Sequence, residues 1–466
     1  MADWILKYRK FSAVLFAMYF VTHIAIRVSD DRGLSFDESE QVFLSQWMRW
    51  GYNSQPPLYT WIQSLFFSIF GYRVLALSLL KNSLIGLTYV VVFRLVHRTT
   101  GDSRKAIAGS LGMLMIPQIA WESHRDLSHT VLVTFATAWL IDRVIATMQS
   151  RTTWNYAAIG IVSALGMMSK YNFAVVVLAV IVSAMTIPRY RQCLLDRRLV
   201  LSLVVAIALF APHLVWVIQH QHLASAKTIG TLTADQTLFY FDNLAVGSKA
   251  LLGSITSCVL LAVVVFAIAY RERFIGRANG SVAVSPSEGL HDATTQLIGR
   301  FLMASFVILA LLVLSGNGLE FKNRWIQPFV CLLPTYFVLR WGVAGGQVRS
   351  FDERLSLNRI ALMGVLAMVA VITGALIRHA RTSGSRVAEM TAEQRMDRTI
   401  DGVILTPIVS LAGDLKLKYP DHMVLANDHP HLGSRWRRSQ DEPATPAARF
   451  PEKLHAEKLP SVSMRR

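Results

Sequence analysis

Most of the residues that could do chemistry in this 466-residue sequence lie in four polar segments, 35–41, 122–129, 169–172 and 320–325. They combine carboxylates with lysine, arginine and histidine next to apolar runs, and ionisable groups in such places are candidates for function. A carboxylate can act as a general base toward a hydroxyl or an amine. Lysine and arginine can neutralise a phosphate, arginine with two parallel hydrogen bonds. This combination suits the transfer of a group from a phosphate-linked lipid donor.

Several of these side chains also have a purely structural interpretation. Glu38 follows a serine by three residues, which is the spacing of a capping box at a helix N-terminus. Asp126 could form a salt bridge with the preceding arginine or cap the next helix. Lys170 and Arg324 could extend from helix ends toward the membrane surface. Asp37 lacks a capping role, so we predict that it is catalytic, with a solvated loop carboxylate as the alternative.

The histidines and cysteines do not indicate a metal site. His124 and His129 are five residues apart, His220 and His222 are two apart, and neither pair has an obvious third ligand. The three cysteines are far apart and lack metal-ligand spacing. We therefore expect no metal ion and no other cofactor.

Membrane-spanning helices are the elements that must position the four segments. Hydrophobic residues make up 53% of the sequence and charged residues only 17%, whereas a soluble chain has about a quarter charged residues. The apolar residues gather in runs long enough to cross a bilayer. The sequence therefore predicts an all-α polytopic membrane protein with about eleven transmembrane helices. The predicted spans are 11–27, 73–96, 105–121, 130–148, 155–169, 172–188, 199–219, 250–270, 300–315, 325–341 and 359–378.

The basic residues predict the orientation of these spans. The formal net charge is +17, and arginine and lysine are concentrated in every second connector, for example 94–105 and 189–198. Such connectors lie in the cytoplasm by the positive-inside rule. We therefore predict a multi-pass protein of the inner (plasma) membrane with a cytoplasmic N-terminus, and with the four polar segments and the C-terminus outside. Because topology accounts for the charge, we expect no nucleic-acid partner.

The first outer loop, 28–72, belongs to the predicted transmembrane domain, 1–379. It contains an apolar run at 58–70 that is too short to cross the membrane. An amphipathic stretch at 40–50 precedes this run. We expect both stretches to form helices that lie on the outer membrane surface.

Residues 380–466 are predicted to form a small extracytoplasmic C-terminal segment that is partly disordered. Apolar residues at 404–411 and 423–426 are consistent with short strands. Beyond residue 437 the composition of Pro, Ser, Lys, Glu and Arg predicts a disordered tail.

The first outer loop resembles bacterial members of glycosyltransferase family 39, which are relatives of the protein O-mannosyltransferases and of the aminoarabinose and galacturonic-acid lipid A transferases. The resemblance rests on Phe-Asp-Glu-Ser-Glu-Gln at 36–41 and Gly-Tyr-Asn-Ser-Gln-Pro-Pro-Leu-Tyr-Thr-Trp at 51–61. Weaker matches follow at 126–130, 169–172 and 321–325. The resemblance implies a GT-C-type fold and a polyprenyl-phosphate sugar as donor.

The resemblance also implies roles for individual residues. In this family an aspartate of the first loop acts as base near the acceptor and corresponds to Asp37, and an acidic residue of the next outer loop corresponds to Asp126. Lys170 and Arg324, with Lys322, correspond to the residues that hold the donor phosphate. We expect displacement at the anomeric carbon with inversion. The catalytic candidates are Asp37, Asp126 and Glu38, and the substrate-binding candidates are Gln55, Tyr59, His129, Lys170, Tyr171, Lys322 and Arg324.

Two other functions are compatible with a polytopic membrane protein. A transporter or flippase of lipid-linked sugars usually has charges at the membrane midplane, discontinuous helices or two related halves. A scaffold would not need carboxylates and cations in four outer segments. We therefore predict a membrane glycosyltransferase whose partners are a polyprenyl-phosphate-linked sugar donor, a lipid or glycan acceptor (lipid A, another glycan or a protein) and membrane lipids. The sequence leaves the sugar and the acceptor open.

Overall fold

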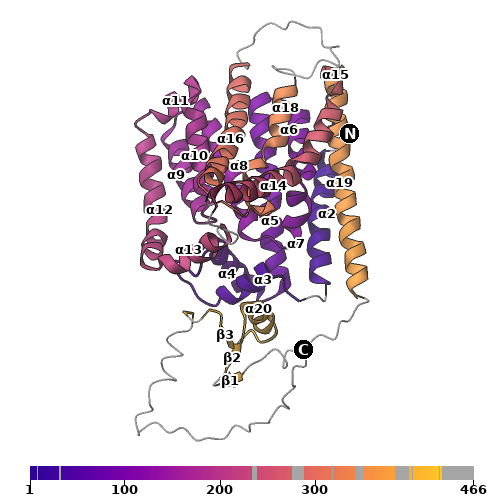
Figure 1. Ribbon diagram of the computed structural model, residues 1–466. Helices are drawn as coiled ribbons and strands as arrows, with labels where there is room; N and C mark the ends of the chain where they lie inside the picture. Colours follow the sequence, from indigo (N-terminus) through magenta and orange to yellow (C-terminus); the bar gives the residue numbers. More distant parts are fainter. Residues whose placement is uncertain are drawn as a thin grey trace, which may run out of the picture.

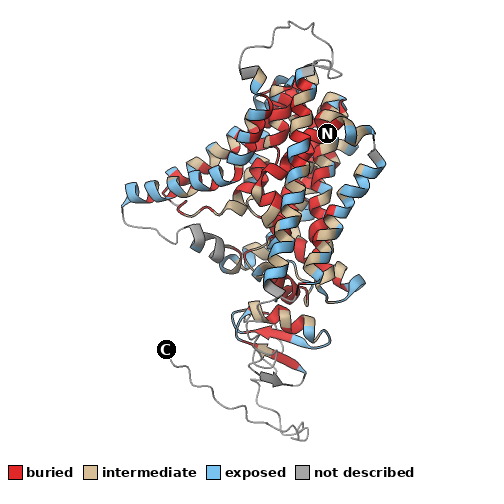
Figure 2. Cartoon of the chain, turned by 90° about the vertical axis from the view of Figure 1, so that its right-hand side faces the viewer, coloured by how far each residue is buried: buried red, intermediate tan, exposed pale blue. Residues whose placement is uncertain are grey.

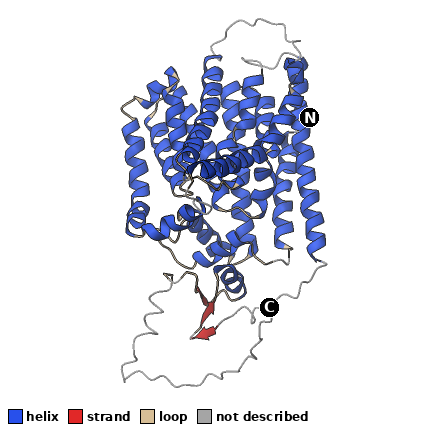
Figure 3. Cartoon of the chain, viewed as in Figure 1, coloured by secondary structure: helices blue, strands red, loops and turns tan. Residues whose placement is uncertain are grey.

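A computed structural model of the chain describes residues 1–7, 9–30, 33–232, 239–274, 288–316, 318–342, 351–383, 398–400, 402–429 and 431–432. Most of these residues are helical, and the described strands gather at one end of the molecule (Figures 1 and 3). Seven described helices are long and apolar enough to cross a membrane. They are α2 (Arg9–Val28), α5 (Val74–Thr100), α8 (His129–Gln149), α12 (Leu199–Gln219), α14 (Tyr240–Ala269), α16 (Glu288–Leu314) and α19 (Phe351–Ser383).

The other four predicted spans form broken or shorter helices, so the described residues do not reproduce eleven single-helix spans. Proline accounts for two of the breaks, because Pro188 and Pro334 each stand in the first turn of a new helix, where a missing N–H is tolerated. The helices on either side of the first break are bent by 120°. The elements concerned are α6 (Ser103–Leu111) with the short helical segments η1 (Gly112–Met115) and η2 (Gln118–Glu122), α9 (Thr153–Met167), α10 (Phe173–Met185) with α11 (Pro188–Leu194), and α17 (Asn323–Val330) with α18 (Leu333–Trp341).

The peripheral helices of the bundle expose apolar side chains. Figure 2 shows exposed residues along the outer helices and buried residues between the helices. In α12 the exposed residues include Leu203, Val204 and Ile207. An apolar surface of this extent needs a partner, and lipid is the natural one for a chain of such helices. These observations show a multi-pass membrane protein.

The loop 28–72 forms two short helices, as predicted. The helix α4 (Leu58–Phe70) has the predicted bounds, whereas α3 (Phe36–Leu44) begins and ends earlier than the predicted stretch at 40–50. Ser35 fixes the early start, because its hydroxyl accepts from the Glu38 N–H and its own N–H donates to the Glu38 carboxylate. The capping box expected from the sequence therefore gives the correct start, whereas the apolar pattern at 40–50 alone places the start too late.

The C-terminal segment adds a small α/β unit to the otherwise helical chain. The strand β2 (Val403–Thr406) pairs antiparallel with β1 (Arg398–Ile400) and parallel with β3 (Met423–Ala426). The helix α20 (Val409–Lys418) makes the crossover between the parallel strands. The predicted strand at 404–411 is therefore only half correct, because α20 begins at Val409. The predicted disorder beyond residue 437 lies outside the described residues.

This α/β unit packs on α3, at the end of the molecule opposite the N-terminus (Figure 1). The Ser39 hydroxyl donates to the carbonyl of Val409 over 2.9 Å and accepts from the Gly413 N–H over 3.0 Å. A side chain at Gly413 would come within 2.4 Å of the Ser39 Cα, so only glycine allows this approach. The amide of Gln46 also pairs with both backbone groups of Val424. The unit therefore holds the helix that carries Asp37 and Glu38.

Candidate active site

Asp37 and Glu38 are neighbours in α3, but they line two different cavities. Consecutive residues of an α-helix point about 100° apart. Asp37 lines a cavity of about 300 Å³, which we call the Asp37 cavity. Glu38 lines a second cavity of about 270 Å³, which also contains Arg27 and which we call the Arg27 cavity. The helix α3 therefore stands between two cavities, and neighbouring residues of the sequence, such as Asp37 and Glu38, line different ones.

Most of the residues predicted from the sequence line the Asp37 cavity. They come from all four polar segments and from the loop before α4, so the fold brings together stretches that are up to about 290 residues apart. Glu38 and Asp126 line the Arg27 cavity instead. Tyr59 is buried behind the wall of the Asp37 cavity. The predicted residues that line the Asp37 cavity are Asp37, Gln55, His129, Lys170, Tyr171, Lys322 and Arg324.

Asp37 lies beside Arg324 in this cavity. The Arg324 Nη1 is 3.7 Å from the Asp37 Oδ1, and the two side chains are 36% and 24% exposed. An ion pair this long and this accessible contributes little to stability. Arg324 can therefore leave Asp37 for a stronger anion without a large energetic cost. Lys322 forms a similar exposed pair with Glu320, with 3.4 Å between Nζ and Oε1.

Lys170 lies deeper in the same cavity. Its ammonium donates to the Thr130 hydroxyl over 2.8 Å, and the residue is buried between the ends of α9 and α10. Burial and the nearby Arg324 guanidinium lower the pKa of Lys170 to about 7, although the Asp37 carboxylate acts in the opposite direction. A buried cation without a carboxylate in contact is costly, and an anion bound in the cavity would remove that cost.

His129 is held in one orientation by the residues around it. Its Nδ1 donates to the Ser169 carbonyl over 3.1 Å, so its Nε2 accepts from the Gln41 amide over 3.1 Å in the neutral ring. The Gln41 carbonyl oxygen accepts from the Thr60 hydroxyl, which fixes the orientation of the amide. The Tyr59 ring packs against His129 with 5.4 Å between ring centroids. Tyr59 therefore supports the cavity wall and does not face the cavity.

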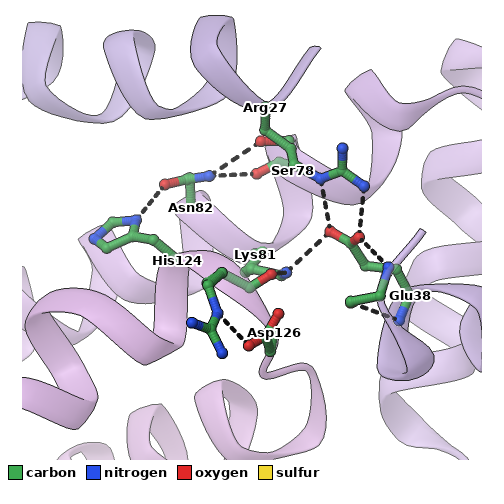
Figure 4. Close-up of polar contacts among 9 residues, drawn as sticks. Arg27, Glu38, Ser78, Lys81, Asn82, His124 and Asp126 are labelled. Atoms are coloured by element: carbon green, nitrogen blue, oxygen red, sulfur yellow. Dashed lines mark hydrogen bonds and ion pairs between the residues drawn. The ribbon is translucent and has the colours of Figure 1, made fainter. Parts of the chain in front are cut away.

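Glu38 forms a buried cluster with two cations (Figure 4). Arg27 donates to the Glu38 carboxylate over 2.7 and 3.2 Å, and the Lys81 ammonium donates to it over 3.2 Å. Burial alone would raise the pKa of the Glu38 carboxyl, but Lys81 and Arg27 outweigh it and lower the pKa to about 2. With the capping box, these contacts occupy both carboxylate oxygens. The fold therefore contains the capping box that the structural interpretation of Glu38 predicts.

Asp126 follows the short helix α7 (Ser123–Arg125) and forms an ion pair with Arg125. This is the structural alternative expected from the sequence. Both side chains lie in the wall of the Arg27 cavity, with Asp126 near the Glu38 cluster in Figure 4. The fold therefore places the two predicted aspartates, Asp37 and Asp126, at different cavities.

Sequence reasoning missed the two cations that hold Glu38. Lys81 is 2% exposed and lies inside the apolar run 73–96. An ionisable residue within a membrane span is itself a signal of function or of a buried partner, so Lys81 could have been found. Arg27 ends the first span and could not be distinguished from an ordinary flanking cation.

The sequence is similar to known glycosyltransferases. Residues 54–216 match the family model of dolichyl-phosphate-mannose-protein mannosyltransferases. The lipopolysaccharide core galacturonosyltransferase RgtB of Rhizobium johnstonii is 30% identical over 419 residues, which cover 89% of this chain and 83% of RgtB. The lipopolysaccharide core galacturonosyltransferase RgtA of the same organism is 27% identical over 431 residues, which cover 91% of this chain and 83% of RgtA.

The fold is similar to that of ArnT from Cupriavidus metallidurans. The crystal structure of ArnT bound to undecaprenyl phosphate has a TM-score of 0.62 at 12% identity and covers 92% of this chain and 89% of ArnT. The apo structure gives a TM-score of 0.59 at 14% identity, with coverages of 93% and 88%. These identities show a shared fold alone. Together with the similarity to RgtB over most of both chains, they show that this chain is a membrane glycosyltransferase of the GT-C fold, similar to glycosyltransferase family 39, and belongs to the same family as RgtB.

Proposed function

We propose that the protein transfers galacturonic acid from a polyprenyl-phosphate donor to the lipopolysaccharide core at the outer side of the inner membrane. One observation carries the proposal: Asp37, Lys170 and Arg324 line one cavity, so a carboxylate suited to act as base and two cations suited to bind phosphate share a site. The donor is supported by the fold of ArnT, which was crystallised with undecaprenyl phosphate. The sugar and the acceptor are supported by the names of RgtB and RgtA.

In the proposed mechanism the acceptor hydroxyl attacks the anomeric carbon as the bond from that carbon to the phosphate oxygen breaks. The hydroxyl proton passes to the Asp37 carboxylate, and the bonding electrons leave with the polyprenyl phosphate. Lys170 and Arg324 stabilise the negative charge that grows on the phosphate in the transition state. A single displacement of this kind inverts the configuration at the anomeric carbon.

Lys322 supports a uronic sugar in this mechanism. Two cations are sufficient for a singly charged phosphodiester, and Lys322 is a third cation in the same cavity. Its ion pair with Glu320 is exposed, so it can be exchanged at low cost. Lys322 would bind the sugar carboxylate, and this contact would favour a uronic acid over a neutral hexose.

The proposal includes an orientation in the membrane. The basic connectors support a cytoplasmic N-terminus by the positive-inside rule, and in this orientation the Asp37 cavity lies on the outer side with α3 and α4. The described C-terminal α/β unit packs on α3 at the same end. We therefore assign the region from residue 380 onward to an extracytoplasmic segment attached to the catalytic transmembrane domain.

Transfer of radiolabelled galacturonic acid tests the proposed function. Membranes that contain the protein receive the labelled polyprenyl-phosphate sugar and lipopolysaccharide from a strain that lacks the gene. We expect label in the lipopolysaccharide core, and no label with membranes from cells without the protein. Labelled donor that crosses the bilayer without transfer to any acceptor would identify a flippase instead. Label on lipid A or protein would correct the acceptor.

Donor affinity is expected to fall as the pH rises through about 7. The pKa of Lys170 is lowered to about 7, chiefly by burial, so the ammonium that binds the phosphate is lost above this pH. The phosphodiester and the sugar carboxylate of the donor keep their charges over this range, so the affinity should fall by up to about tenfold for each pH unit above the Lys170 pKa. Binding of the donor to purified protein as a function of pH measures this slope. Lys170→Arg keeps its charge and should remove the slope, whereas an unchanged slope would show that another group titrates.

A further inference from the structure

His213 is a buried polar residue that the proposed mechanism does not use. It belongs to α12, which lies at the edge of the bundle in Figure 1 and packs mainly on α9. Within α12, which the structure describes throughout, only Ser202 and His213 are fully buried, and His213 is 0% exposed. An ionisable residue inside a membrane span signals a function or a specific partner. The contacts of His213 therefore indicate its role.

Both ring nitrogen atoms of His213 contact other segments of the chain. The Nδ1 donates to the Trp50 carbonyl over 2.6 Å. Because a carbonyl can only accept, the Nε2 of the neutral ring carries no proton and accepts from the Tyr171 hydroxyl over 3.2 Å. The rings of His213 and Tyr171 are nearly parallel, with 5.9 Å between their centroids. His213 therefore joins Tyr171 to the segment that begins at Trp50.

The two partners of His213 belong to two walls of the Asp37 cavity. Tyr171 follows the end of α9 and lines the cavity. Trp50 begins a stretch before α4 that we call the 50–55 segment, and Ser54 and Gln55 of this segment also line the cavity. His213 is not among the described residues that line it. His213 therefore supports both walls from behind, without contacting a molecule in the cavity.

A second contact holds the 50–55 segment against α12. Trp216 lies one helical turn after His213, and residues three apart share one face of a helix. A Cβ atom at Gly51 would come within 2.1 Å of the Trp216 ring, so only glycine allows the segment to approach α12 here. The segment thus meets α12 at Gly51 and at the Trp50 carbonyl. Both contacts are on the helix face that carries His213.

From these contacts we propose that His213 is a positioning residue of the donor site, which holds Tyr171 and the 50–55 segment where the donor requires them. The inference rests on the proposed function, because it assumes that the donor occupies the Asp37 cavity. Without His213, the Tyr171 hydroxyl and the Trp50 carbonyl would lose their partner. Buried polar groups that lose a partner favour other arrangements, so both walls would shift and donor binding would weaken.

Three substitutions of His213 separate its two hydrogen bonds. The amide nitrogen of asparagine can replace Nδ1, so His213→Asn can keep the bond to Trp50 but loses the bond to Tyr171. Glutamine is longer and places its amide near the position of Nε2, so His213→Gln can keep the bond to Tyr171 but loses the bond to Trp50. His213→Phe keeps a ring and removes both bonds. Tyr171→Phe removes the bond to His213 from the other side.

His220→Phe is the matched control. His220 follows the end of α12, and its ring stacks on Trp216 with 5.0 Å between centroids. Its Nδ1 donates to the Trp216 carbonyl over 3.0 Å. The substitution therefore removes a histidine hydrogen bond and keeps a ring next to the same tryptophan, but it does not touch a residue of the cavity wall. Donor binding and transfer should stay at the native level.

The readouts are the KM values for donor and lipopolysaccharide, kcat, and the temperature of thermal unfolding. The donor KM of His213→Phe should rise about tenfold, the scale expected for lost buried hydrogen bonds. Its kcat and its KM for lipopolysaccharide should change little. His213→Asn should resemble Tyr171→Phe, and the double variant should be no worse than either one, because both changes remove the same bond. A purely structural role would lower the unfolding temperature and the amount of active protein without raising the donor KM selectively.

Two outcomes would overturn the inference while the proposed function stands. One is an unchanged donor KM in His213→Phe with normal transfer, and the other is fully additive effects of His213→Asn and Tyr171→Phe. Binding of polyprenyl-phosphate galacturonic acid to the full chain in nanodiscs gives an answer without turnover. If the native chain binds this donor but transfers no sugar, the proposed function fails. Weaker donor binding in His213→Phe than in His220→Phe would then still support the inference, and equal binding would exclude it.

Discussion

Replacing Asp37 with asparagine is expected to reduce sugar transfer by about 10²- to 10⁴-fold, the range that a positioned general base contributes. The variant keeps the size of the side chain and can still accept a hydrogen bond from Arg324, 3.7 Å away in the native protein. It cannot take the proton of the acceptor hydroxyl. The donor KM should therefore change little while kcat falls. Transfer of labelled sugar in membranes with equal amounts of native and variant protein measures the effect.

The control for this variant is Asp421→Asn. Asp421 is an exposed carboxylate of the C-terminal α/β unit, at the same end of the molecule and outside both cavities. Its replacement changes the charge of the chain by the same amount and should leave transfer at the native level. Native activity in Asp37→Asn would remove Asp37 as the base. In that case Asp126→Asn becomes the decisive variant, because Asp126 is the other predicted aspartate.

Features encoded by adjacent residues could be predicted from the sequence. The bounds of α4 are local: Pro57 precedes the helix, and Gly71 follows it with a φ of 74°, which favours glycine. The seven long apolar helices can also be recognised from the apolar composition of their sequences. The approximate membership of the Asp37 cavity could be inferred because outer-face residues of a polytopic protein must lie at one depth.

Features that depend on contacts between distant residues could not be predicted. The break of the run 105–121 into α6, η1 and η2 depends on packing against other helices, for example Gly112 against Phe266 and Pro334. The assignment of Glu38 and Asp37 to different cavities depends on how α3 is rotated. The α/β unit controls that rotation through Ser39 and Gly413, which are 374 residues apart. No pattern among neighbouring residues indicates such a contact.

We propose that Glu38 has the structural role expected from the capping box and not the catalytic one, and the reason is general. A carboxylate next to the proposed base Asp37 has the right residue type, but its partners decide its role. In the fold Glu38 is surrounded by Arg27, Lys81 and the backbone of Ser35. A base in such surroundings is a poor proton acceptor, because its pKa is lowered to about 2. Glu38 is better suited to holding α2, α3 and α5 together.

Replacing Glu38 with glutamine is accordingly expected to destabilise the protein by about 3–5 kcal/mol, the usual cost of removing one partner from a buried ion pair. The two cations would stay buried without the carboxylate that both of them contact, since the Arg27 and Lys81 side chains are only 13% and 3% exposed. The temperature of thermal unfolding in detergent should fall clearly below that of the native chain. The exposed carboxylate of Glu320 offers a matched control, and Glu320→Gln should cost less than about 1 kcal/mol.

The same cluster predicts how the native protein responds to acid. The pKa of Glu38 is depressed in the folded state, from an ordinary value of 4.5 to about 2. The stabilising contribution of the Glu38 carboxylate is therefore complete above about pH 4.5, and it is lost as the pH falls from there toward about 2. In Glu38→Gln this part of the acid sensitivity should disappear. In the double variant Glu38→Gln/Lys81→Met one uncompensated cation is removed, and part of the lost stability should return. An unfolding temperature that is unchanged in Glu38→Gln, together with a loss of transfer, would instead assign Glu38 to catalysis.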